Sequence, residues 1–428
     1  MNTKFFNPQF ETLSQDEIKH LQLERLKDRL KHVYNNNAIQ KKRFDEKGVN
    51  PEDIKTLEDI ELLPIMDKEL LRTSYPMGLS CVDQSQIKEM HMSSGSTGTP
   101  VVMPYTANDL AQWAECMARC YYMAGGQEND TVQITPSFGL FNGGFGMYHG
   151  ARAAGMFVIP AGAGNTERQI KLAGDFGTKV LTGVVSYGIR IMEVMQELGK
   201  ELPDLKIGIF GAEAFSEGMK EKLEKGLGID VYDIYGMTET GGVGTLGMDC
   251  CAHNGIHVWE DHYIVEVVDP NTGKSVPDGD HGELIFTSLT RKALPVIRFK
   301  TGDLSRVVSR EKCDCGRTHI KIEAITGRVD DMLIVKGVNF WPKQVEQALM
   351  QIPGIGSNYQ IILENTGGVQ NVRVNVEADG SVTGHMVCKV LKEALGFAPE
   401  GDVFPIGGLP RQEGKAIRVF HGSGDVKK

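Results

Sequence analysis

A helical period of apolar residues is the first clear pattern in the chain. The run Ser14-Gln15-Asp16-Glu17 has the serine-to-glutamate spacing of a capping box. Apolar side chains then recur at steps close to one or more helical turns, at Ile18, Leu21, Leu26, Leu30 and Val33. The pattern predicts an amphipathic helix that begins directly after Ser14.

From about residue 100 onward, short apolar runs with the length of buried strands alternate with helical segments. The runs that predict strands are 156–159, 180–182, 207–210 and 230–234. Ser216 predicts the N-cap of the helix that follows the third of them. Ligands bind at strand ends in such α/β sheets, which draws attention to Gly211-Ala212-Glu213 and to Tyr235-Gly236.

The C-terminal half predicts a second sheet and a small separate domain. Residues from about 257 to 310 are β-rich, with strands at 263–268 and 283–287. A small α/β segment follows, with a helix near 342–350. We place the domain boundary at Asp330. The fold class is therefore α/β, with a large multi-sheet N-terminal domain at 1–329 and a small α/β C-terminal domain at 330–428.

Length and charge narrow the function classes. A chain of 428 residues is too long for one ordinary domain. The 46 Lys and Arg against 56 Asp and Glu give a formal charge of −10, and no dense basic stretch offers a nucleic-acid surface. No signal-peptide core and no run of about 18 apolar residues is present. We therefore expect a cytoplasmic protein that binds neither nucleic acid nor membrane.

The eight cysteines are expected to be reduced in that compartment, as metal ligands or core residues. Soft ligands from two β-rich loops suit tetrahedral Zn²⁺. The preferred ligands are Cys250, His257, Cys313 and Cys315, with Cys251 and His253 as possible substitutes. The alternative is that they are reduced cysteines in turns. Cys116 and Cys120, one helical turn apart, are expected in the core.

Two widely separated segments suit phosphate chemistry. The loop Ser93-Ser94-Gly95-Ser96-Thr97-Gly98-Thr99-Pro100 offers backbone N–H groups and hydroxyls that can surround an anion. It lacks the Gly-Lys-Ser/Thr ending of a P-loop, and an ordinary turn is the alternative. Lys415, in Leu409-Pro410-Arg411-Gln412-Glu413-Gly414-Lys415, supplies a mobile positive charge. Their separation predicts two domains that meet for reaction.

Three further motifs carry polar groups suited to a nucleotide. Tyr235-Gly236-Met237-Thr238-Glu239-Thr240 combines a ring, a hydroxyl and a carboxylate that can bind Mg²⁺. Arg298-Phe299-Lys300-Thr301-Gly302-Asp303 ends in a carboxylate suited to ribose hydroxyls. Gly327-Arg328-Val329-Asp330-Asp331 offers a cation and a candidate hinge. Taken singly, each is equally well explained as a capping acid, a turn aspartate or an exposed turn.

Taken together and in this order, the motifs resemble the adenylate-forming acyl-CoA synthetase superfamily over nearly the whole chain. The resemblance is nearest to the phenylacetate–CoA ligase group, on 93–100, Gly139-Leu140-Phe141-Asn142-Gly143-Gly144, 235–239, 327–337 and 410–415. It implies that a carboxylate attacks the α-phosphorus of ATP and expels pyrophosphate, after which the thiol of coenzyme A displaces AMP. It also implies that the small domain rotates between the two steps.

Carried onto this chain, the resemblance assigns a role to each matching position. The catalytic residues would be Lys415, Thr238 and Glu239, with Glu239 on Mg²⁺, the hinge Asp330, and the coenzyme A contacts Lys336 and Gly337. The ATP and AMP contacts would be Ser93, Ser94, Gly95, Ser96, Thr97, Gly98, Gly211, Ala212, Glu213, Asp233, Tyr235, Gly236, Met237, Thr238, Asp303 and Arg328. The acid pocket would be lined by Phe138, Phe141, Gly143, Phe145 and Ala214.

Several points stay open at the level of sequence. Pro136 stands where the resembled group often has tyrosine, so phenylacetate is the first expectation and indoleacetate or benzoate are alternatives. The phenylalanines can equally be core residues. An enzyme that loads a carrier-protein thiol and a non-catalytic nucleotide-binding relative are the other functions considered. Retention of Glu239, Asp303, Arg328 and Lys415 together weighs against the second. Homodimers are common in the resembled group, which makes a homodimer the expectation here.

Overall fold

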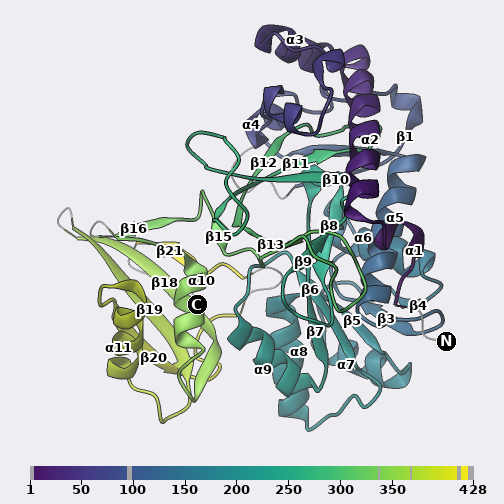
Figure 1. The fold of residues 1–428 in the computed structure, drawn as a ribbon. Coiled ribbons are helices and arrows are strands. Elements are labelled where there is room, and N and C mark those ends of the chain that lie inside the picture. The colour runs from purple at the N-terminus through teal and green to yellow at the C-terminus, as the bar shows by residue number, and fades with distance from the viewer. Residues whose placement is uncertain (1–3, 94–98, 336–337, 367–368, 412–415, 423–428) are drawn as a thin grey trace. The chain divides into compact units, whose positions relative to one another are not determined.

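The computed structural model describes residues 4–93, 99–335, 338–366, 369–411 and 416–422 (Figure 1). Ser94, Gly95, Ser96, Thr97, Gly98, Lys336, Gly337 and Lys415, all expected to contact ligands, lie outside these ranges. The chain divides into two compact units. The first contains the residues up to Gly183, Leu202–Ala212 and Tyr232–Ala324, and the second contains Val184–Glu201, Glu213–Val231 and the residues from Ile325 onward.

The elements follow one another in an order that confirms an α/β fold. Up to residue 324, the helices are α1 (Pro8–Glu11), α2 (Gln15–Asn36), α3 (Ala38–Lys47), α4 (Lys68–Thr73), α5 (Ala107–Met123), α6 (Asn142–Ala153) and α7 (Thr166–Asp175), which belong to the first unit, and α8 (Val185–Leu198) and α9 (Glu217–Leu227), which belong to the second. The 3-10 turns are η1 (Pro51–Asp53), η2 (Glu58–Leu62), η3 (Gln84–Gln86) and η4 (Thr238–Thr240). The strands are β1 (Ile87–Met92), β2 (Val102–Thr106), β3 (Thr131–Ile134), β4 (Phe157–Ile159), β5 (Val180–Val184), β6 (Ile207–Gly211), β7 (Asp230–Met237), β8 (Gly242–Asp249), β9 (Ile256–Val258), β10 (Tyr263–Val268), β11 (Gly282–Ser288), β12 (Phe299–Ser305), β13 (Val307–Ser309) and β14 (Lys321–Ile322).

The predicted N-terminal helix is confirmed as α2. The Ser14 hydroxyl accepts a hydrogen bond from the Glu17 amide, and the Glu17 carboxylate accepts one from the Ser14 amide, which completes the capping box. The apolar stripe is buried at Ile18, Leu26, Leu30 and Val33, while Leu21 is only half-buried. Burying this stripe stabilises the helix far more than the cap does, because each buried aliphatic side chain contributes roughly 1.5–3 kcal/mol.

The main sheet of the first unit has nine strands, in the order β13-β14-β9-β8-β7-β6-β5-β3-β4. Strands β3, β4 and β5 are parallel, whereas β7, β8 and β9 are antiparallel. All four strands predicted between residues 156 and 234 are present as β4, β5, β6 and β7. A second sheet, in which β10, β11 and β12 are antiparallel, contains the two β-rich segments predicted after residue 257.

The core beside the main sheet is built around the indole of Trp113 on α5, which is fully buried. A Cβ atom at Gly146 on α6 would lie 2.3 Å from Trp113 Cζ2, and one at Gly242 on β8 would lie 2.4 Å from it. Only glycine therefore allows these two backbones to approach the indole so closely. Cys116 and Cys120, on the same helix, are fully buried as expected.

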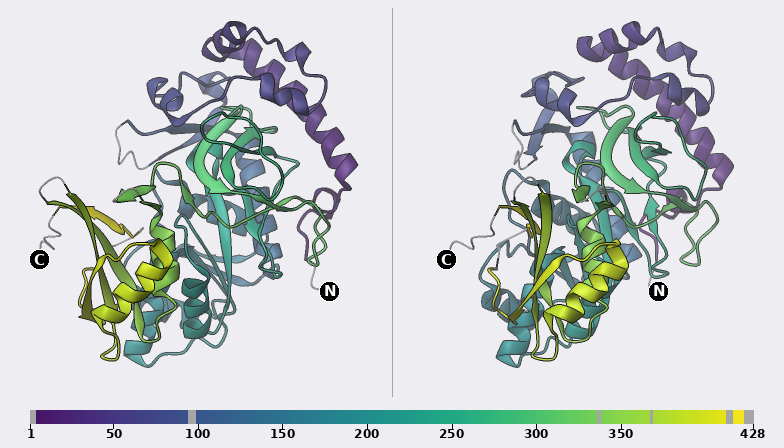
Figure 2. Two further views of the ribbon diagram at one scale, coloured as in Figure 1. Left: turned by 60° about the vertical axis from the view of Figure 1, so that its left-hand side comes forward. Right: turned by 90° about the vertical axis from the view of Figure 1, so that its left-hand side faces the viewer.

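The C-terminal part of the second unit is a small α/β fold. It contains β15 (Gly327–Arg328), β16 (Leu333–Val335), β17 (Val338–Phe340), α10 (Pro342–Leu349), β18 (Ile355–Thr366), β19 (Val369–Ala378), α11 (Gly384–Leu395), β20 (Glu400–Pro405) and β21 (Val419–His421). One sheet has the order β20-β19-β18-β21. The helices α10 and α11 pack together and share an apolar core with that sheet, along which α11 lies (Figure 2). The helix predicted near 342–350 is confirmed as α10.

None of the helices in the described residues combines the length and the apolar character that a membrane span requires.

Candidate active site and metal centre

The turn that follows β7 carries two of the predicted site residues. Strand β7 runs three residues beyond the predicted Ile234, to Met237, and Thr238 and Glu239 follow directly in η4. A Cβ atom at Gly236 would lie only 2.3 Å from the Gly242 carbonyl oxygen, so the strand can pass here only without a side chain. The extended strand thus brings the hydroxyl and the carboxylate to the sheet's carboxyl end.

The ring of Tyr235 and the carboxylate of Asp303 meet although 68 residues separate them in sequence. Tyr235 Oη donates to Asp303 Oδ2 at 2.7 Å, and both residues are buried. Asp303 lies within β12 after Gly302, whose φ of +81° coincides with an irregularity in the pairing of β11 with β12, so the segment is a strand where a tight turn was expected. The two motifs expected to bind a nucleoside are therefore joined by a hydrogen bond within the first unit.

The hydroxyl of Thr238 is oriented by Asn142, the first residue of α6. Asn142 Nδ2 donates to Thr238 Oγ1 at 2.7 Å, and Asn142 Oδ1 accepts from the Val243 amide at 3.1 Å. The carbonyl of Val243 in turn accepts a 2.9 Å hydrogen bond from the Trp113 indole. The Thr238 hydroxyl is thus connected to the core through the amide side chain of Asn142. Residue patterns alone gave Asn142 no such role.

The carboxylate of Glu239 is buried, with 4% of the residue exposed, and forms an ion pair with a residue that sequence reasoning missed. Lys68 Nζ, on α4, lies 2.8 Å from Glu239 Oε1. A buried carboxylate needs a positive partner, because burial without one is costly. Lys68 supplies that charge here, and a divalent cation would supply it equally well. The residues present therefore fit Mg²⁺.

Two other strand-end segments lie where the sequence placed them. Gly211 ends β6, and a Cβ atom there would be 2.4 Å from the Ile234 carbonyl oxygen, so glycine is required. Ala212 has a φ of +65° and is exposed. Ser93 closes the base of its loop, since its hydroxyl accepts a 2.9 Å hydrogen bond from the Val101 amide. Met237 and Asp233 are both half-buried on β7.

The expected second-unit residues occupy different surroundings. The Glu213 carboxylate accepts 2.9 Å hydrogen bonds from the amide and the hydroxyl of Ser186. Burial raises the pKa of Glu213, and these hydrogen bonds oppose that effect. Ala214 is exposed. Arg328 lies 2.9 Å from Asp330, and its carbonyl accepts a 2.8 Å hydrogen bond from the indole of Trp341.

The phenylalanines expected to line the acid pocket separate into two groups. The rings of Phe138 and Phe145 meet edge to face, with centroids 5.4 Å apart. Phe141, at the N-cap of α6, forms the second group, because it is 51% exposed whereas Phe138 and Phe145 are partly buried against the core. Gly143, in the first turn of α6, has its Cβ position 3.4 Å from Pro136 Cβ.

A titratable cluster beside Phe145 was not anticipated. Glu89 Oε1 lies 2.7 Å from His91 Nε2 and 3.2 Å from His149 Nε2. Burial raises the pKa of Glu89, but hydrogen bonds from the two imidazoles outweigh it and hold that pKa at about 2. The rings of Phe145 and His149 are 6.1 Å apart, so this charge borders the aromatic cluster.

Three cysteines and a histidine converge at a buried point of the first unit. The potential ligand atoms of Cys250, His257, Cys313 and Cys315 all lie within 4.8 Å of one another. Cys250 Sγ and Cys313 Sγ are 3.7 Å apart, and Cys315 Sγ is 3.4 Å from His257 Nε2. A tetrahedral zinc with about 2.3 Å Zn–S bonds predicts S–S separations of roughly 3.8 Å. The spacing of these atoms therefore suits one zinc ion.

The surroundings of the cluster favour ligation. His257 Nδ1 lies 3.0 Å from the His319 carbonyl, a contact that leaves Nε2 for the metal. A hydrogen bond from the Cys250 thiol lowers the pKa of Cys315. The cationic side chains of Arg317 and Lys321 lie 3.9 and 3.8 Å from the Cys315 and Cys313 sulfurs, where they balance thiolate charge.

The two residues named as possible substitutes lie outside the cluster. Cys251 is exposed, and the side chain of His253 is paired with Asp249 at 2.9 Å. The preferred set of four is therefore the one that the fold brings together.

The comparisons with known proteins agree with this architecture. Residues 11–289 match the family model described as AMP-binding enzyme, and residues 337–422 match that of the AMP-binding enzyme C-terminal domain. The chain belongs to the AMP-binding enzyme family, as an acid–thiol ligase of the AMP-forming class. Within that class it belongs to the phenylacetate–CoA ligase group, because its curated relatives include enzymes of that group.

Two curated relatives are phenylacetate-coenzyme A ligases. The one from Escherichia coli (strain K12) is 38% identical, over 96% of this chain and 96% of its own length. The one from Aromatoleum evansii is 41% identical, over 86% of this chain and 83% of its own. Among solved structures, 2-hydroxyisobutyryl-CoA ligase in the postadenylation state with 2-HIB-AMP has a TM-score of 0.92 at 26% identity, covering 99% of this chain and 93% of its own. The expected family and fold class are confirmed.

Proposed function

We propose that the acid this enzyme activates is aromatic, with phenylacetate as the first candidate. The observation that carries the proposal is the 38% identity to a phenylacetate-coenzyme A ligase over 96% of both chains. The edge-to-face pair of Phe138 and Phe145 supports it, because such rings offer flat apolar walls to an aryl group. Phe141, Gly143 and Ala214 complete the proposed pocket.

An exchange screen tests this assignment. ATP–pyrophosphate exchange would be measured with phenylacetate, indoleacetate, benzoate and short aliphatic acids, including 2-hydroxyisobutyrate. Aryl acids, phenylacetate above all, are expected to support exchange. Exchange with the short aliphatic acids alone would overturn the aromatic assignment. Indoleacetate or benzoate as the preferred acid would retain the aromatic class and replace phenylacetate.

The proposed chemistry has two steps at one nucleotide site. A carboxylate oxygen of the acid attacks the α-phosphorus of ATP, the bond to the β-phosphate oxygen breaks, and pyrophosphate leaves. The sulfur of coenzyme A then attacks the acyl carbon, and AMP leaves with the bonding electrons. Because two anions meet in the first step, positive charge and hydrogen-bond donors must surround the transferring group.

Specific residues are proposed for that task. Lys415 would bridge the carboxylate and the α-phosphate, and Thr238, held by Asn142, would donate its hydroxyl to the phosphate. Glu239 would hold Mg²⁺, which neutralises phosphate charge when bound. Asp303 and Arg328 would bind the ribose. The remaining nucleotide contacts proposed are Ser93, Ser94, Gly95, Ser96, Thr97, Gly98, Gly211, Ala212, Glu213, Asp233, Tyr235, Gly236 and Met237.

The two-domain division belongs to the same proposal. Residues 1–329 would form the adenylation domain and 330–428 the mobile domain, with Asp330 as the pivot. Arg328 holds Asp330 at 2.9 Å, a contact that rotation about this residue would have to release. Lys336 and Gly337 would line the path of coenzyme A after rotation. An enzyme that loads a carrier-protein thiol is distinguished by offering coenzyme A and a carrier protein with the same acid.

We also propose that Cys250, His257, Cys313 and Cys315 bind one structural Zn²⁺. The four-ligand set is closed and buried, which suits a structural rather than a catalytic ion. Mass spectrometry of metals in protein purified without chelator is expected to find about one zinc per chain. Protein that is active, folded and free of metal would contradict the proposal.

A cytoplasmic homodimer is proposed as the working state. All eight cysteines are free thiols, which supports a reducing compartment. The homodimer rests on the family resemblance, and light scattering on the purified enzyme is expected to give twice the mass of 47.1 kDa. A monomer mass at micromolar concentration would contradict it.

A further inference from the structure

The loop that provides two of the proposed zinc ligands also contacts the N-terminal segment. Residues 310–320, all described, form turns and bends without a helix or strand. Within this loop the Cys313 amide donates to the Arg317 carbonyl at 2.8 Å, and the Gly316 amide donates to the Cys313 carbonyl at 2.8 Å. Its shape is therefore defined by one tight turn and by the side chains on its two sides.

One side of the loop faces the proposed metal. Cys313 and Cys315 alternate with Asp314, so both sulfurs lie on the side of Cys250 and His257. A loop without secondary structure has little to hold it in place when the metal is absent, because metal binding supplies folding free energy to such sites.

The other side of the loop binds the first residues of the chain. The Arg317 guanidinium donates to the Lys4 carbonyl at 2.7 Å and lies 2.5 Å from a carboxylate oxygen of Glu11. It also lies 4.9 Å from the ring centre of Phe5. Arg317 and Glu11 are 1% and 0% exposed, so this ion pair is shielded from water and depends on both partners.

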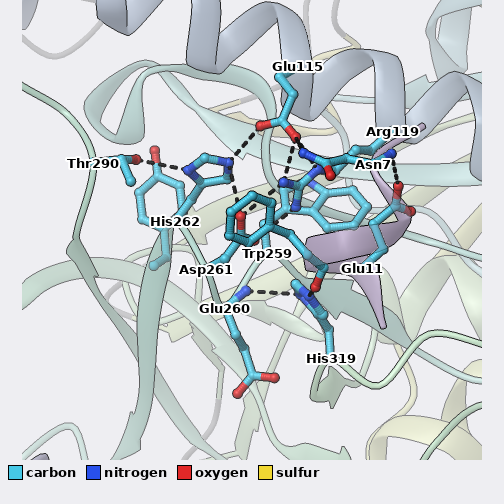
Figure 3. Close-up of polar contacts among 12 residues, drawn as sticks. Asn7, Glu11, Glu115, Arg119, Trp259, Glu260, Asp261, His262, Thr290 and His319 are labelled. Atoms are coloured by element: carbon cyan, nitrogen blue, oxygen red, sulfur yellow. Dashed lines mark hydrogen bonds and ion pairs between the residues drawn. The ribbon is translucent and has the colours of Figure 1, made fainter. Parts of the chain in front are cut away.

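Further contacts extend this interface. His319 Nε2 lies 2.9 Å from the Phe10 carbonyl, and Gln15 Nε2 donates to the Thr318 carbonyl at 2.6 Å. Figure 3 shows Glu11 and His319 near the indole of Trp259, whose ring centre is 6.0 Å from that of His319. Asn7 makes a separate contact, a 2.7 Å hydrogen bond to Glu115 on α5. The ring of Phe6 also lies 5.5 Å from that of Tyr122 on α5, so the 313–319 loop shares the attachment of the N-terminal segment with α5.

The longer helix α2 has its own attachments. Gln22 donates to the Glu260 carbonyl at 2.9 Å, and Arg29 donates to the Leu289 carbonyl at 3.1 Å. Its apolar stripe is buried independently of the loop. Loss of the loop's shape is therefore expected to affect the residues before Ser14 and to leave α2 in place.

We propose that the zinc site acts as a structural clamp, in which the metal orders the 313–319 loop and the loop holds residues 4–13 against the first unit. The inference rests on the proposed zinc site. It assigns that metal a specific task, which is attachment of the N-terminal segment rather than stabilisation of the nucleotide site.

Hydrogen exchange on the intact enzyme tests the clamp. The amides of Phe10 and Glu11 both donate to the Asn7 carbonyl, so they are expected to be protected while the segment is docked. Removing zinc with a thiol-competing chelator is expected to speed exchange in 4–13 by about tenfold or more, whereas segments of α2 beyond Gln22 change little.

Three variants separate the clamp from the metal. Cys313→Ser should lose zinc and release the segment. Glu11→Gln should retain zinc, because it leaves Arg317 beside Cys315, and should still release the segment by removing the buried ion pair. Cys251→Ser, the matched control at an exposed neighbouring cysteine, should change neither zinc content nor exchange.

The outcomes are distinguishable. Zinc removal that leaves exchange at 4–13 unchanged would overturn the clamp and leave the metal proposal standing. Purified protein without metal would overturn both. If Cys313→Ser does not fold, chelation and Glu11→Gln still decide the question. Acid activation is measured separately, by ATP–pyrophosphate exchange, so a wrong substrate proposal would not affect the result.

Discussion

Tyr235 Oη donates a 2.7 Å hydrogen bond to Asp303 Oδ2 and so joins the end of β7 to β12. The aspartate is buried. The bond fixes the carboxylate before any nucleotide arrives. Such preorganisation lowers the entropy that binding would otherwise lose.

Asp303→Asn is predicted to raise the KM for ATP. Hydrogen bonds to charged groups contribute roughly 1.5–3 kcal/mol, which corresponds to about a 10- to 150-fold loss in binding. Tyr235→Phe is the matched control, since it keeps the ring and the carboxylate and removes only the fixing hydrogen bond. The KM for ATP in Tyr235→Phe should rise only a few-fold. Steady-state kinetics at saturating acid measures both, and an unchanged KM in Asp303→Asn would exclude the ribose role.

Asn142→Asp is predicted to lower kcat for adenylation about fivefold. The carboxylate can still accept from the Val243 amide but can no longer donate to Thr238, and one neutral hydrogen bond contributes roughly 1 kcal/mol. The KM for the acid should change much less. Thermal unfolding within a few degrees of the parent would confirm that folding is intact. Thr238→Ser, which retains a hydroxyl, should keep most of the activity.

Lys68→Met is predicted to reduce the Mg²⁺ concentration needed for half-maximal activity. Lys68 and a divalent cation compete for the same Glu239 carboxylate, so removing the lysine charge leaves that carboxylate to the metal. The lysine side chain is 41% exposed, so the pair contributes at most about 1 kcal/mol, which limits the shift to roughly fivefold. Measuring activity against Mg²⁺ concentration for the parent and the variant gives this shift. A higher requirement would mean that Lys68 itself assists phosphate binding.

Lys415→Ala is predicted to abolish adenylation and largely spare thioester formation from a supplied acyl-adenylate. Removing one charge-stabilising group typically slows the step it serves by roughly 10²–10³-fold. Single-turnover assays of each half-reaction provide the measurement. Equal loss of both half-reactions would argue against domain alternation.

The acid stability of the first unit is predicted to depend on Glu115. Burial raises its pKa, but the hydrogen bond from His262 and the charge of Arg119 outweigh burial and hold that pKa at about 2. Figure 3 shows this carboxylate between the two partners. Because the folded pKa lies below the unfolded value, the stabilisation is fully present above about pH 4.5 and is lost as the pH falls toward 2. Its size is on the order of 3 kcal/mol.

Glu115→Gln removes the titrating carboxylate and so tests whether its stabilising effect is lost at low pH. The variant should be less stable than the parent at pH 7, and the difference should shrink as the pH falls from about 4.5 toward 2. Denaturant unfolding across that range measures it. The same change at exposed Glu24 is the control and should have little effect at any pH. A stability difference that stays constant with pH would contradict the assignment.

The local elements of this fold were predictable, whereas their pairings were not. The Ser14 cap and the apolar stripe of α2 act over a few residues, so the sequence pattern was sufficient. Strand β7 was predicted to end at Ile234 but continues to Met237. The extension depends on β8, where Tyr235 pairs with Gly247 and Met237 with Gly242, and no local pattern contains that information.

The site was predictable in its residue types and not in its connections. The motif containing Thr238 and Glu239 was found from order and chemistry. Their partners Asn142 and Lys68 lie far away in sequence and were missed. The choice between Cys250 and Cys251 needed the structure, because both lie in the turn after β8 and only the fold shows that Cys250 is buried in the cluster while Cys251 is exposed.

The indole of Trp113 is enclosed by the glycines of α6 and β8 and linked through Val243 and Asn142 to the proposed catalytic hydroxyl. The packing of this indole therefore limits which substitutions on α6 can be used to change the acid specificity of the enzyme. Enlarging residues on α6 to narrow the proposed acid pocket is expected to shift the indole, and with it the turn that carries Thr238. Substrate range and adenylation rate are expected to trade against each other in evolved variants.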